Sequence, residues 1–196
     1  MARKKSIAPK REAKQARSKA TIEAILSAAG LVIDKHGYQA ATTDRIAAKA
    51  GVSVGTVYQY FNNKDEIFER FLAREEAKVL VAFSRVVSLK DKSKRFRLGT
   101  YIRAGAPKYL SPRVFDELSR VASLREPIRH LSASVIEVTA TLIQSLRPDL
   151  SSEVVRTYAV LLVTTAQGLR AASETGADEV LLGSYIEMFE KFLLVD

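Results

Sequence analysis

Apolar residues recur every three or four positions along most of this chain, and this spacing restricts its fold more than any other feature. Spacings of three and four belong to amphipathic helices, whereas a half-buried strand alternates at every second position. The first stretch starts at Ser18, places Ile22, Ile25 and Ala29 on one face, and ends at Gly37, where glycine can close a helix. Alternating segments bounded by hairpin turns, and internal repeats, are both absent from the sequence. We therefore predict an all-α fold of about nine helices.

Two short helices are predicted directly after this first one. Thr42 and Thr43 offer an N-cap for one of them, and Ser53 can cap the other, over residues 54–60. Gly51 lies in the tight turn between the two. Helices this short are unstable alone, so both must pack against their neighbours.

Six longer helical segments follow, separated by prolines, glycines and charged residues. Asn63 followed by Glu66 resembles a capping box, which starts the first of them. Ser111, with Pro112 at the next position, marks another helix start. The predicted segments cover residues 63–89, 94–106, 111–122, 126–147, 151–174 and 178–194.

The positive charge of the chain is concentrated in its first third. The formal net charge is +9, from 31 Lys and Arg and 22 Asp and Glu. Residues 1–64 hold 12 Lys or Arg against 4 Asp or Glu, whereas residues 65–196 hold 19 against 18. This asymmetry favours a module that binds a polyanion, joined to a nearly neutral one, and residues 1–17 read as a basic flexible arm. A solvated basic tail is the alternative interpretation.

Composition disfavours several other classes of protein. The chain has no cysteine, which excludes a disulfide framework, thiolate zinc sites and cysteine nucleophiles. Its longest charge-free apolar stretch, residues 157–169, is shorter than the ~18–20 residues that span a bilayer. The basic N-terminus lacks the apolar core of a signal peptide. We expect a cytoplasmic, all-α protein without a membrane segment, a metal or a cofactor.

The two short helices match the geometry of a helix-turn-helix, in which the second helix lies in the major groove of DNA and the first crosses the backbone behind it. Apolar Val52, Val57 and Phe61 would anchor the second helix to its support. The remaining residue types fit DNA contact: a glycine for close approach, hydroxyls, an amide for base edges, and groups that meet phosphates. These are Gly55, Thr56, Tyr58, Gln59, Tyr60 and Lys64.

A longer string makes this signal more specific. Residues 24–72 contain, in order and without gaps, Ala28-Ala29, Gly37-Tyr38, Thr42-Thr43, Ile46-Ala47, Ala50-Gly51-Val52-Ser53, Gly55-Thr56-Val57-Tyr58-Gln59-Tyr60-Phe61, Lys64 and Asp65-Glu66. The string closely resembles the DNA-binding domain of the tetracycline-repressor (TetR) family. It covers about a quarter of the chain, and the helical remainder agrees with the family in architecture.

The resemblance implies a role for each matching position. Thr43 would lie near a phosphate, residues 53–60 would form the end of the turn and the recognition helix, and Lys64 would grip the DNA backbone from the start of the next helix. The expected DNA-contacting residues are Thr42, Thr43, Arg45, Ser53, Val54, Gly55, Thr56, Tyr58, Gln59, Tyr60 and Lys64.

Some positions depart from the family or allow two readings. Ala41 stands where many members carry threonine, so a contact is missing there, and Asp44 places an acid near the expected DNA surface, where it can interact with its own helix N-terminus. Tyr58 is either a DNA contact or partly a packing residue. Val54 either reads a thymine methyl or lies at the surface. The basic arm either enters a flanking minor groove or adds only non-specific affinity.

The resemblance also implies a homodimer. We predict a DNA-binding domain at residues 18–64 and an effector-binding and dimerisation domain at residues 65–196. The last two helical segments carry apolar stripes, and two such helices from each subunit can form a four-helix bundle; the alternative is that both stripes are intrachain core. The predicted interface consists of Tyr158, Leu162, Ala166, Leu169, Leu182, Tyr185, Met188, Phe189 and Phe192.

A small-molecule effector, bound between the helices of residues 94–174, is a further implication of the resemblance. Polar or aromatic residues on otherwise apolar helices are the candidate contacts, although such residues more often lie at a surface or in a core. Arg103 and Arg170 point weakly to an anionic effector. The candidates are Tyr101, Arg103, Phe115, His130, Gln144, Gln167 and Arg170.

The resulting prediction is a sequence-specific transcriptional regulator, by default a repressor that an effector releases from a palindromic operator. An activator of the same family is the alternative. An enzyme is not expected, because the chain has only two histidines and shows no glycine-rich phosphate loop or paired-carboxylate motif. A non-specific, nucleoid-type DNA-binding protein is a less favoured alternative.

Overall fold

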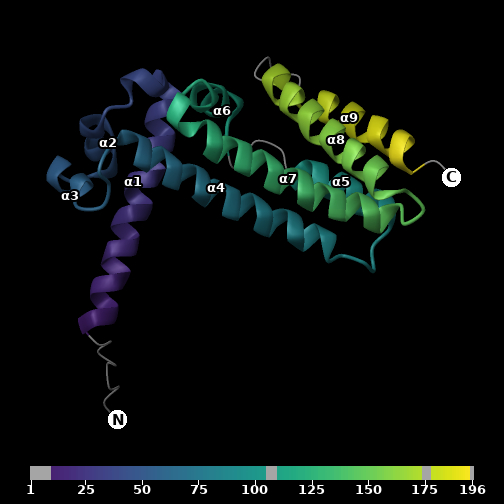
Figure 1. Cartoon of the computed structure of the whole chain (residues 1–196), viewed down its shortest axis with the longest axis horizontal. Helices are drawn as coiled ribbons and strands as arrows, with labels where there is room; N and C mark the ends of the chain where they lie inside the picture. Colours follow the sequence, from purple (N-terminus) through teal and green to yellow (C-terminus); the bar gives the residue numbers. More distant parts are fainter. Residues whose placement is uncertain (1–9, 105–109, 174–177, 195–196) are drawn as a thin grey trace, which may run out of the picture. The chain divides into compact units, whose positions relative to one another are not determined.

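The computed structural model describes residues 10–104, 110–173 and 178–194, except for the side chains of residues 10–13, 167–173 and 178. These residues form nine α-helices and one short 3₁₀ helix, and no strand occurs among them (Figure 1). The all-α prediction is confirmed. Within this described part, no helix is both long enough and apolar enough to cross a membrane.

The chain divides into two compact units, Met1–Phe71 and Leu72–Asp196, so the boundary falls inside a helix. Unit 1 contains α1 (Lys10–Ala40), α2 (Thr43–Ala50), α3 (Val54–Tyr58) and the first part of α4 (Lys64–Val87). Unit 2 contains the rest of α4 and then α5 (Lys94–Ala104), α6 (Pro112–Ser119), η1 (Ala122–Leu124), α7 (Arg125–Leu146), α8 (Ser152–Ser173) and α9 (Asp178–Leu193). The second domain that the sequence predicts, from residue 65, begins in the first turn of α4.

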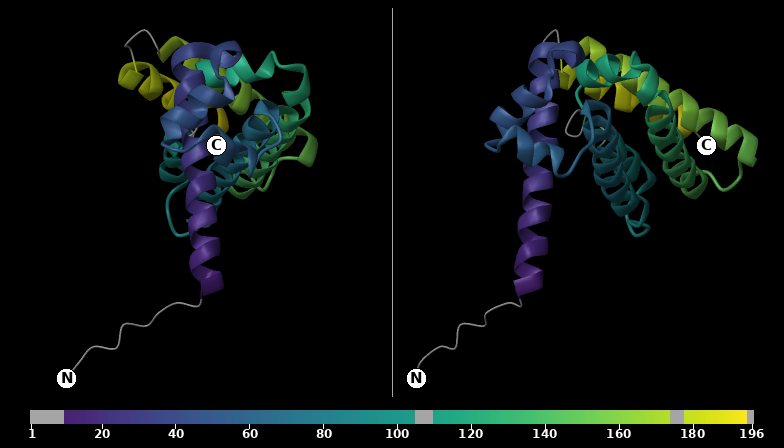
Figure 2. Two further views of the ribbon diagram at one scale, coloured as in Figure 1. Left: turned by 90° about the vertical axis from the view of Figure 1, so that its left-hand side faces the viewer. Right: turned by 60° about the vertical axis from the view of Figure 1, so that its left-hand side comes forward.

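Helix α1 begins eight residues earlier than its apolar periodicity predicts, at Lys10 rather than Ser18. Its N-terminal half extends beyond α2 and α3 (Figures 1 and 2), and the side chains of Lys14 and Lys19 are exposed there. Residues 10–17 are rich in alanine, lysine and arginine, which favour helix, and contain no glycine or proline. A helical segment with no buried face needs no periodic apolar residues, so apolar periodicity does not predict it.

Gly37 interrupts α1 at the position that the sequence indicates. Its backbone has φ 78° and ψ 168°, outside the helical region, in a part of φ space that glycine occupies without a Cβ penalty. The chain turns there and places Tyr38, which is only 7% exposed, against the core of unit 1.

The core of unit 1 is formed by α1 and the first part of α4 together with α2 and α3. At Gly30 of α1 the packing leaves no room for a side chain, because an added Cβ would lie 2.8 Å from Cε2 of Phe71 on α4. The ring of Phe68 packs against both Tyr38 and Phe71, with centroid distances of 5.4 and 6.3 Å. Fully or almost fully buried side chains include Ile25, Ala29, Ile33, Ile46, Val57, Phe61, Ile67 and Phe68.

Unit 2 has a separate core, formed by the second half of α4 with α5, α7, α8 and α9. The rings of Phe83 and Tyr101 are stacked at its centre, 4.1 Å between centroids. The Tyr101 hydroxyl shares a 2.7 Å hydrogen bond with the Thr139 hydroxyl, which satisfies both buried groups. The other members include Leu98, Leu142, Ile143, Leu146, Ala159, Leu162, Ile186 and Phe189.

Candidate nucleic-acid interface

Helix α2 is fixed at both ends by the residues that the sequence indicates. Thr42 is its N-cap, with an extended backbone and a hydroxyl that accepts a 3.3 Å hydrogen bond from the amide of Arg45. Gly51 closes the helix in the left-handed conformation, with φ 70° and ψ 30°. The Arg45 guanidinium donates to the carbonyl of Ala40 at 3.0 Å, which ties α2 back to the end of α1.

Helix α3 begins directly after this turn, and its inner face is apolar. Ser53 is the N-cap, and its hydroxyl accepts from the Thr56 amide at 3.0 Å. Val57 and Phe61 are 0% and 2% exposed, which confirms that they anchor the helix, whereas Val52 is only half-buried.

The outer face of α2 and α3 is polar and accessible. Tyr58 is 55% exposed, and its hydroxyl lies 3.3 Å from that of Thr43, so the two helices share a hydrogen bond at their surface. Gln59 is exposed and Tyr60 half-exposed. The bridge between the two helices agrees with the packing role of Tyr58, and its DNA contact stays a prediction. Val54, Thr56 and Thr43 are half-buried, and Thr42, Arg45, Ser53 and Gly55 are exposed.

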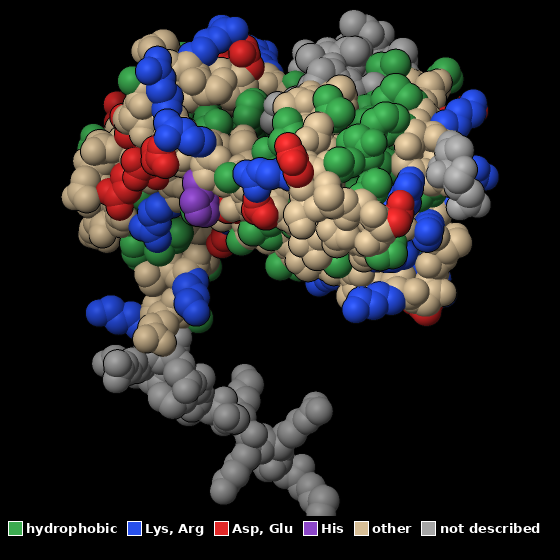
Figure 3. Space-filling model, turned by 45° about the vertical axis from the view of Figure 1, so that its right-hand side comes forward, with side chains coloured by type: hydrophobic (Ala, Val, Ile, Leu, Met, Phe, Trp, Pro, Cys, Tyr) green, Lys and Arg blue, Asp and Glu red, His purple; other side chains and the backbone are tan. Residues whose placement is uncertain are grey.

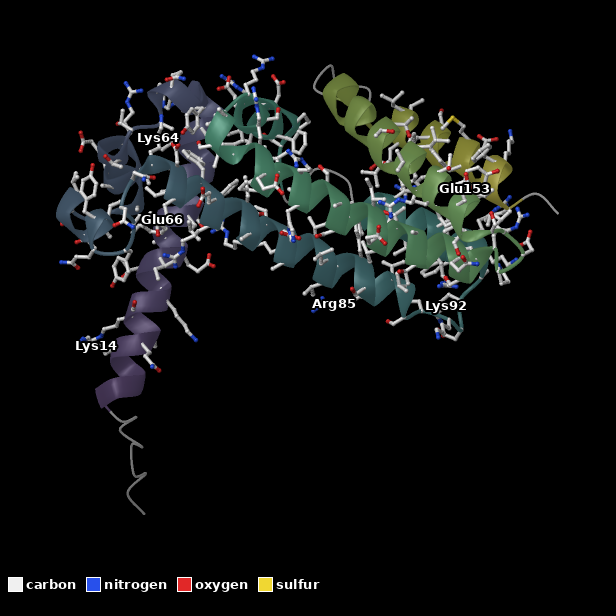
Figure 4. All side chains as sticks on the ribbon, viewed as in Figure 1. Lys14, Lys64, Glu66, Arg85, Lys92 and Glu153 are labelled. Atoms are coloured by element: carbon white, nitrogen blue, oxygen red, sulfur yellow. The ribbon has the colours of Figure 1, made fainter. Side chains whose placement is uncertain are left out.

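The turn from α3 into α4 is held by bonds that the capping-box pattern predicts only in part. Asn63 accepts from the Glu66 amide at 2.9 Å, as expected for an N-cap. The Glu66 carboxylate, labelled in Figure 4, instead accepts from the amide and the side chain of Asn62, at 2.7 and 2.8 Å. Arg70, which the sequence did not single out, donates to the carbonyl of Tyr60 at 3.1 Å.

Lys64, also labelled in Figure 4, lies in the first turn of α4 and is half-exposed. Its ammonium donates to the carbonyl of Tyr38 at 3.0 Å and lies 3.8 Å from the centroid of the same residue's ring. The Tyr38 hydroxyl donates to the carboxylate of Asp65. Burial lowers the pKa of Lys64, while the charge of Asp65 acts in the opposite direction. The sequence string includes Tyr38 and Asp65, but their contact was not predicted, because only the fold brings them together across 27 positions.

The candidate effector residues occupy different surroundings in unit 2. Tyr101 is buried on Thr139, whereas Arg103 is exposed and lies 3.6 Å from the Glu179 carboxylate. His130 is also exposed, and its Nδ1 lies 3.1 Å from a Glu76 oxygen. Phe115 is half-buried, and Gln144 donates to the carbonyls of Arg147 and Leu150, while the side chains of Gln167 and Arg170 lie outside the described residues. The candidates that the structure describes do not share one contact partner, and their role in binding an effector stays a prediction.

The candidate interface residues on α8 and α9 divide into a buried and an exposed group. Leu162, Tyr185 and Phe189 are at most 7% exposed and belong to the core of unit 2. Met188 and Phe192 are 50% and 48% exposed. Tyr158, Ala166 and Leu182 are partly buried, and the side chain of Leu169 lies outside the described residues.

The exposed candidates belong to an apolar face on α8 and α9. Among the described residues, nine large hydrophobic side chains are exposed, and five of them lie on α8 and α9. Figure 3 shows hydrophobic side chains gathered on this side of unit 2. The sequence pattern did not single out three of the five, namely Val160, Leu161 and Val180.

Comparison with known proteins finds matches to part of the chain. Residues 25–71 match the model of the bacterial regulatory proteins of the tetR family. The nucleoid occlusion factor SlmA of Haemophilus ducreyi is 37% identical over 68 residues, which are 35% of this chain and 32% of that protein. The chain therefore matches about a third of the length of this relative.

Solved structures extend the similarity of fold over most of the chain. A transcriptional regulator from Rhodococcus sp. Rha1 has a TM-score of 0.72 and 23% identity, covering 89% of this chain and 98% of that one. FadR from Bacillus subtilis, solved in complex with stearoyl-CoA, has a TM-score of 0.70 and 20% identity, covering 85% and 96%. At these identities the likeness bears on the fold.

A capped helix-turn-helix with a polar outer face, followed by an all-α second unit, defines the class as a helix-turn-helix protein. The helix-turn-helix lies within residues 25–71, which match the model of the bacterial regulatory proteins of the tetR family.

Proposed function

We propose that this chain is a sequence-specific, DNA-binding transcriptional regulator in the cytoplasm and not an enzyme. The observation that carries the proposal is the exposed polar face of α2 and α3, fixed from behind by Val57 and Phe61. A recognition helix needs this arrangement, because rigid anchoring sets the position of the side chains that reach base edges. Gln59 is the residue proposed to read a base, and Lys64 the one proposed to bind a phosphate.

Retention of genomic DNA fragments at physiological salt, with competitor DNA present, tests this proposal. We expect a retained fragment with a protected palindrome of about one to three helical turns in a footprint. Gln59→Ala should relax sequence preference at one position of each half-site, with a loss of about 1–3 kcal/mol for the preferred base. Lys92→Gln removes one exposed cation of unit 2 and serves as the control for Lys64→Gln, which removes the proposed phosphate ligand. Uniform binding that vanishes with salt would instead favour the non-specific, nucleoid-type alternative.

A homodimer is the proposed active form, with the exposed apolar face of α8 and α9 covered by a second copy. Five exposed hydrophobic side chains on two neighbouring helices are an unfavourable surface for a monomer in water. Two-fold symmetry would also place two recognition helices on a palindrome. Light scattering after size-exclusion chromatography should give twice the 21.7 kDa chain mass. Phe192→Glu should shift this towards the monomer, while Val81→Glu, at an equally exposed site on α4, should not.

Repression with release by a small-molecule effector is the proposed mode of regulation. Steric occlusion of a promoter needs no contact with polymerase, which makes repression the simpler mode; an activator stays the alternative. Because the FadR structure holds stearoyl-CoA, this molecule is a reasonable first probe. Release of the retained fragment by added stearoyl-CoA, with no release by coenzyme A alone at the same concentration, would support the proposal.

A further inference from the structure

The first turn of α4 places a cation and an anion side by side at the proposed DNA surface. Lys64 is the proposed phosphate ligand, and Asp65 is the next residue. A carboxylate adjoining a phosphate-binding ammonium competes with the phosphate for it, since both are anionic oxygen acceptors. Recognition of DNA by Lys64 therefore depends on where Asp65 is held.

Tyr38 contacts both residues with different atoms. Its hydroxyl donates to Oδ1 of Asp65, and its carbonyl accepts from the Lys64 ammonium at 3.0 Å. Its ring also lies beneath the ammonium, 3.8 Å from centroid to Nζ. An ammonium has three donors, so the single bond to Tyr38 leaves two for a phosphate.

Tyr38 is itself held firmly. It is 7% exposed, its ring packs on Phe68, and it follows the turn at Gly37. Burial, together with the hydrogen bond to Asp65 and the charge of Asp65, raises the pKa of the Tyr38 hydroxyl far above the working range. The hydroxyl therefore keeps its proton near neutral pH and remains a donor to the carboxylate.

We propose that Tyr38 is a positioning residue for DNA binding, which holds the Asp65 carboxylate on its hydroxyl and so keeps the Lys64 ammonium available to a phosphate. The inference rests on the proposed function and names a residue that does not itself touch DNA. A purely structural tie between the end of α1 and α4 would use the same hydrogen bond, so the test must separate these two roles.

Tyr38→Phe is the decisive change, because it removes only the hydroxyl and keeps the ring and the carbonyl. Without this hydroxyl, the Asp65 carboxylate should move towards the Lys64 ammonium and pair with it. The slope of log K against log salt is negative, and its magnitude falls by about 0.9 for each phosphate that the protein no longer neutralises. A dimer that loses one phosphate contact in each subunit should therefore lose about 1.8. Between about 50 and about 200 mM salt this makes the salt-induced weakening of binding roughly twelvefold smaller, and Lys64→Gln should give the same change.

The double variant Tyr38→Phe/Asp65→Asn separates positioning from structure. With the competing carboxylate gone, Lys64 should again bind its phosphate and the wild-type slope should return. Asp65→Asn alone and Asp44→Asn, a second acid near this surface, correct for the general gain from removing negative charge. A wild-type slope in Tyr38→Phe, or a reduced slope that Asp65→Asn does not restore, would overturn the proposal.

A second measurement needs no DNA and keeps the inference distinct from the proposed function. In the free full-length chain, Tyr38→Phe should raise the pKa of Lys64, observed by NMR of its ammonium, because an ion pair favours the charged form. The pKa should return in the double variant. An unchanged Lys64 pKa in Tyr38→Phe refutes the positioning role even if DNA binding is established, whereas failure of wild type to retain any fragment refutes the proposed function.

Discussion

The left-handed turn at Gly51 gives a prediction that depends on backbone conformation and not on contacts with neighbouring side chains. An alanine Cβ at this position meets no atom within 4 Å, so steric exclusion by neighbours does not oppose it. The backbone φ of 70°, however, brings a Cβ close to the following carbonyl oxygen, which costs about 1–2 kcal/mol. Alanine also restricts the unfolded chain, which returns about 0.4–1 kcal/mol. Gly51→Ala should therefore lower the free energy of unfolding by about 0.8 kcal/mol.

Gly55 offers a matched control four positions away in the same motif. It lies in α3, its φ is not positive, and an added Cβ would be 3.7 Å from the Ser53 hydroxyl oxygen, an ordinary contact. Gly55→Ala should leave stability unchanged or raise it by up to about 1 kcal/mol, from helix propensity. Gly51→Asn should lie between wild type and Gly51→Ala, because asparagine tolerates the left-handed region better than alanine.

Thermal unfolding followed by circular dichroism measures these differences. For a chain of this length, about 1 kcal/mol corresponds to about 2–4 °C in Tm. Gly51→Ala should lower Tm by about 2–3 °C, and Gly55→Ala should not lower it at all. Equal shifts for the two alanine variants, or a Gly51→Asn variant no more stable than Gly51→Ala, would show that φ does not govern the turn.

Three further changes test the packing, the cap and the electrostatics. Gly30→Ala should destabilise unit 1 by about 1 kcal/mol. Crowding of the buried Phe71 ring costs about 1–3 kcal/mol, whereas the better helix propensity of alanine returns about 1 kcal/mol at most. A more stable variant would mean that the ring moves aside at no cost. Ser53→Ala should cost about 1 kcal/mol in the same thermal assay, because an α3 amide loses its cap, and a smaller loss with glycine than with alanine would agree with this cause. The hydrogen bonds from Arg147 lower the pKa of Asp149 to about 2, so the carboxylate stabilises the fold above its unfolded pKa and this contribution disappears as the pH falls from about 4 towards 2. Asp149→Asn should therefore be less stable than wild type at pH 7 in urea, and the two should converge near pH 2; a constant difference would exclude this cause.

The sequence predicts those parts of the structure that depend on near neighbours. Thr42 and Ser53 cap helices through bonds to residues three positions ahead, and Gly51 acts through its own φ. Such features leave a local signature of residue type and spacing, which explains why the helix-turn-helix was placed within a residue or two. The early start of α1 was missed for the opposite reason, since its exposed turns carry no apolar stripe.

Contacts between distant positions could not be predicted from a single chain. Tyr38 reaches Asp65 across 27 positions, and the local spacing of neither residue indicates this contact. The stripes on α8 and α9 raise the same difficulty, because periodicity finds an apolar face but does not say which of its members a neighbouring helix covers. Leu162 and Phe189 belong to the core, while Met188 and Phe192 stay exposed, and only the packing of α8 against α9 separates them.

Helix α4 is the element through which an effector signal would have to pass under the proposed function, because it alone contributes to both units. Its first turn is bonded through Asp65 to Tyr38, and the carbonyl of Val87 in its last turn accepts from the buried guanidinium of Arg97 at 3.1 Å. The same guanidinium donates to Ser145 of α7 at 2.7 Å, so α4, α5 and α7 meet at one side chain. A ligand that moves α5 against α7 would therefore disturb the end of α4. The ligand can shift DNA affinity only by its own preference between the two arrangements, typically about 1–3 kcal/mol. A hydrogen bond to a charged group contributes about 1.5–3 kcal/mol, which is comparable to that whole range. Tyr38 and Arg97, which make such bonds at the two ends of α4, are therefore the positions where a single substitution should change the response to an effector most.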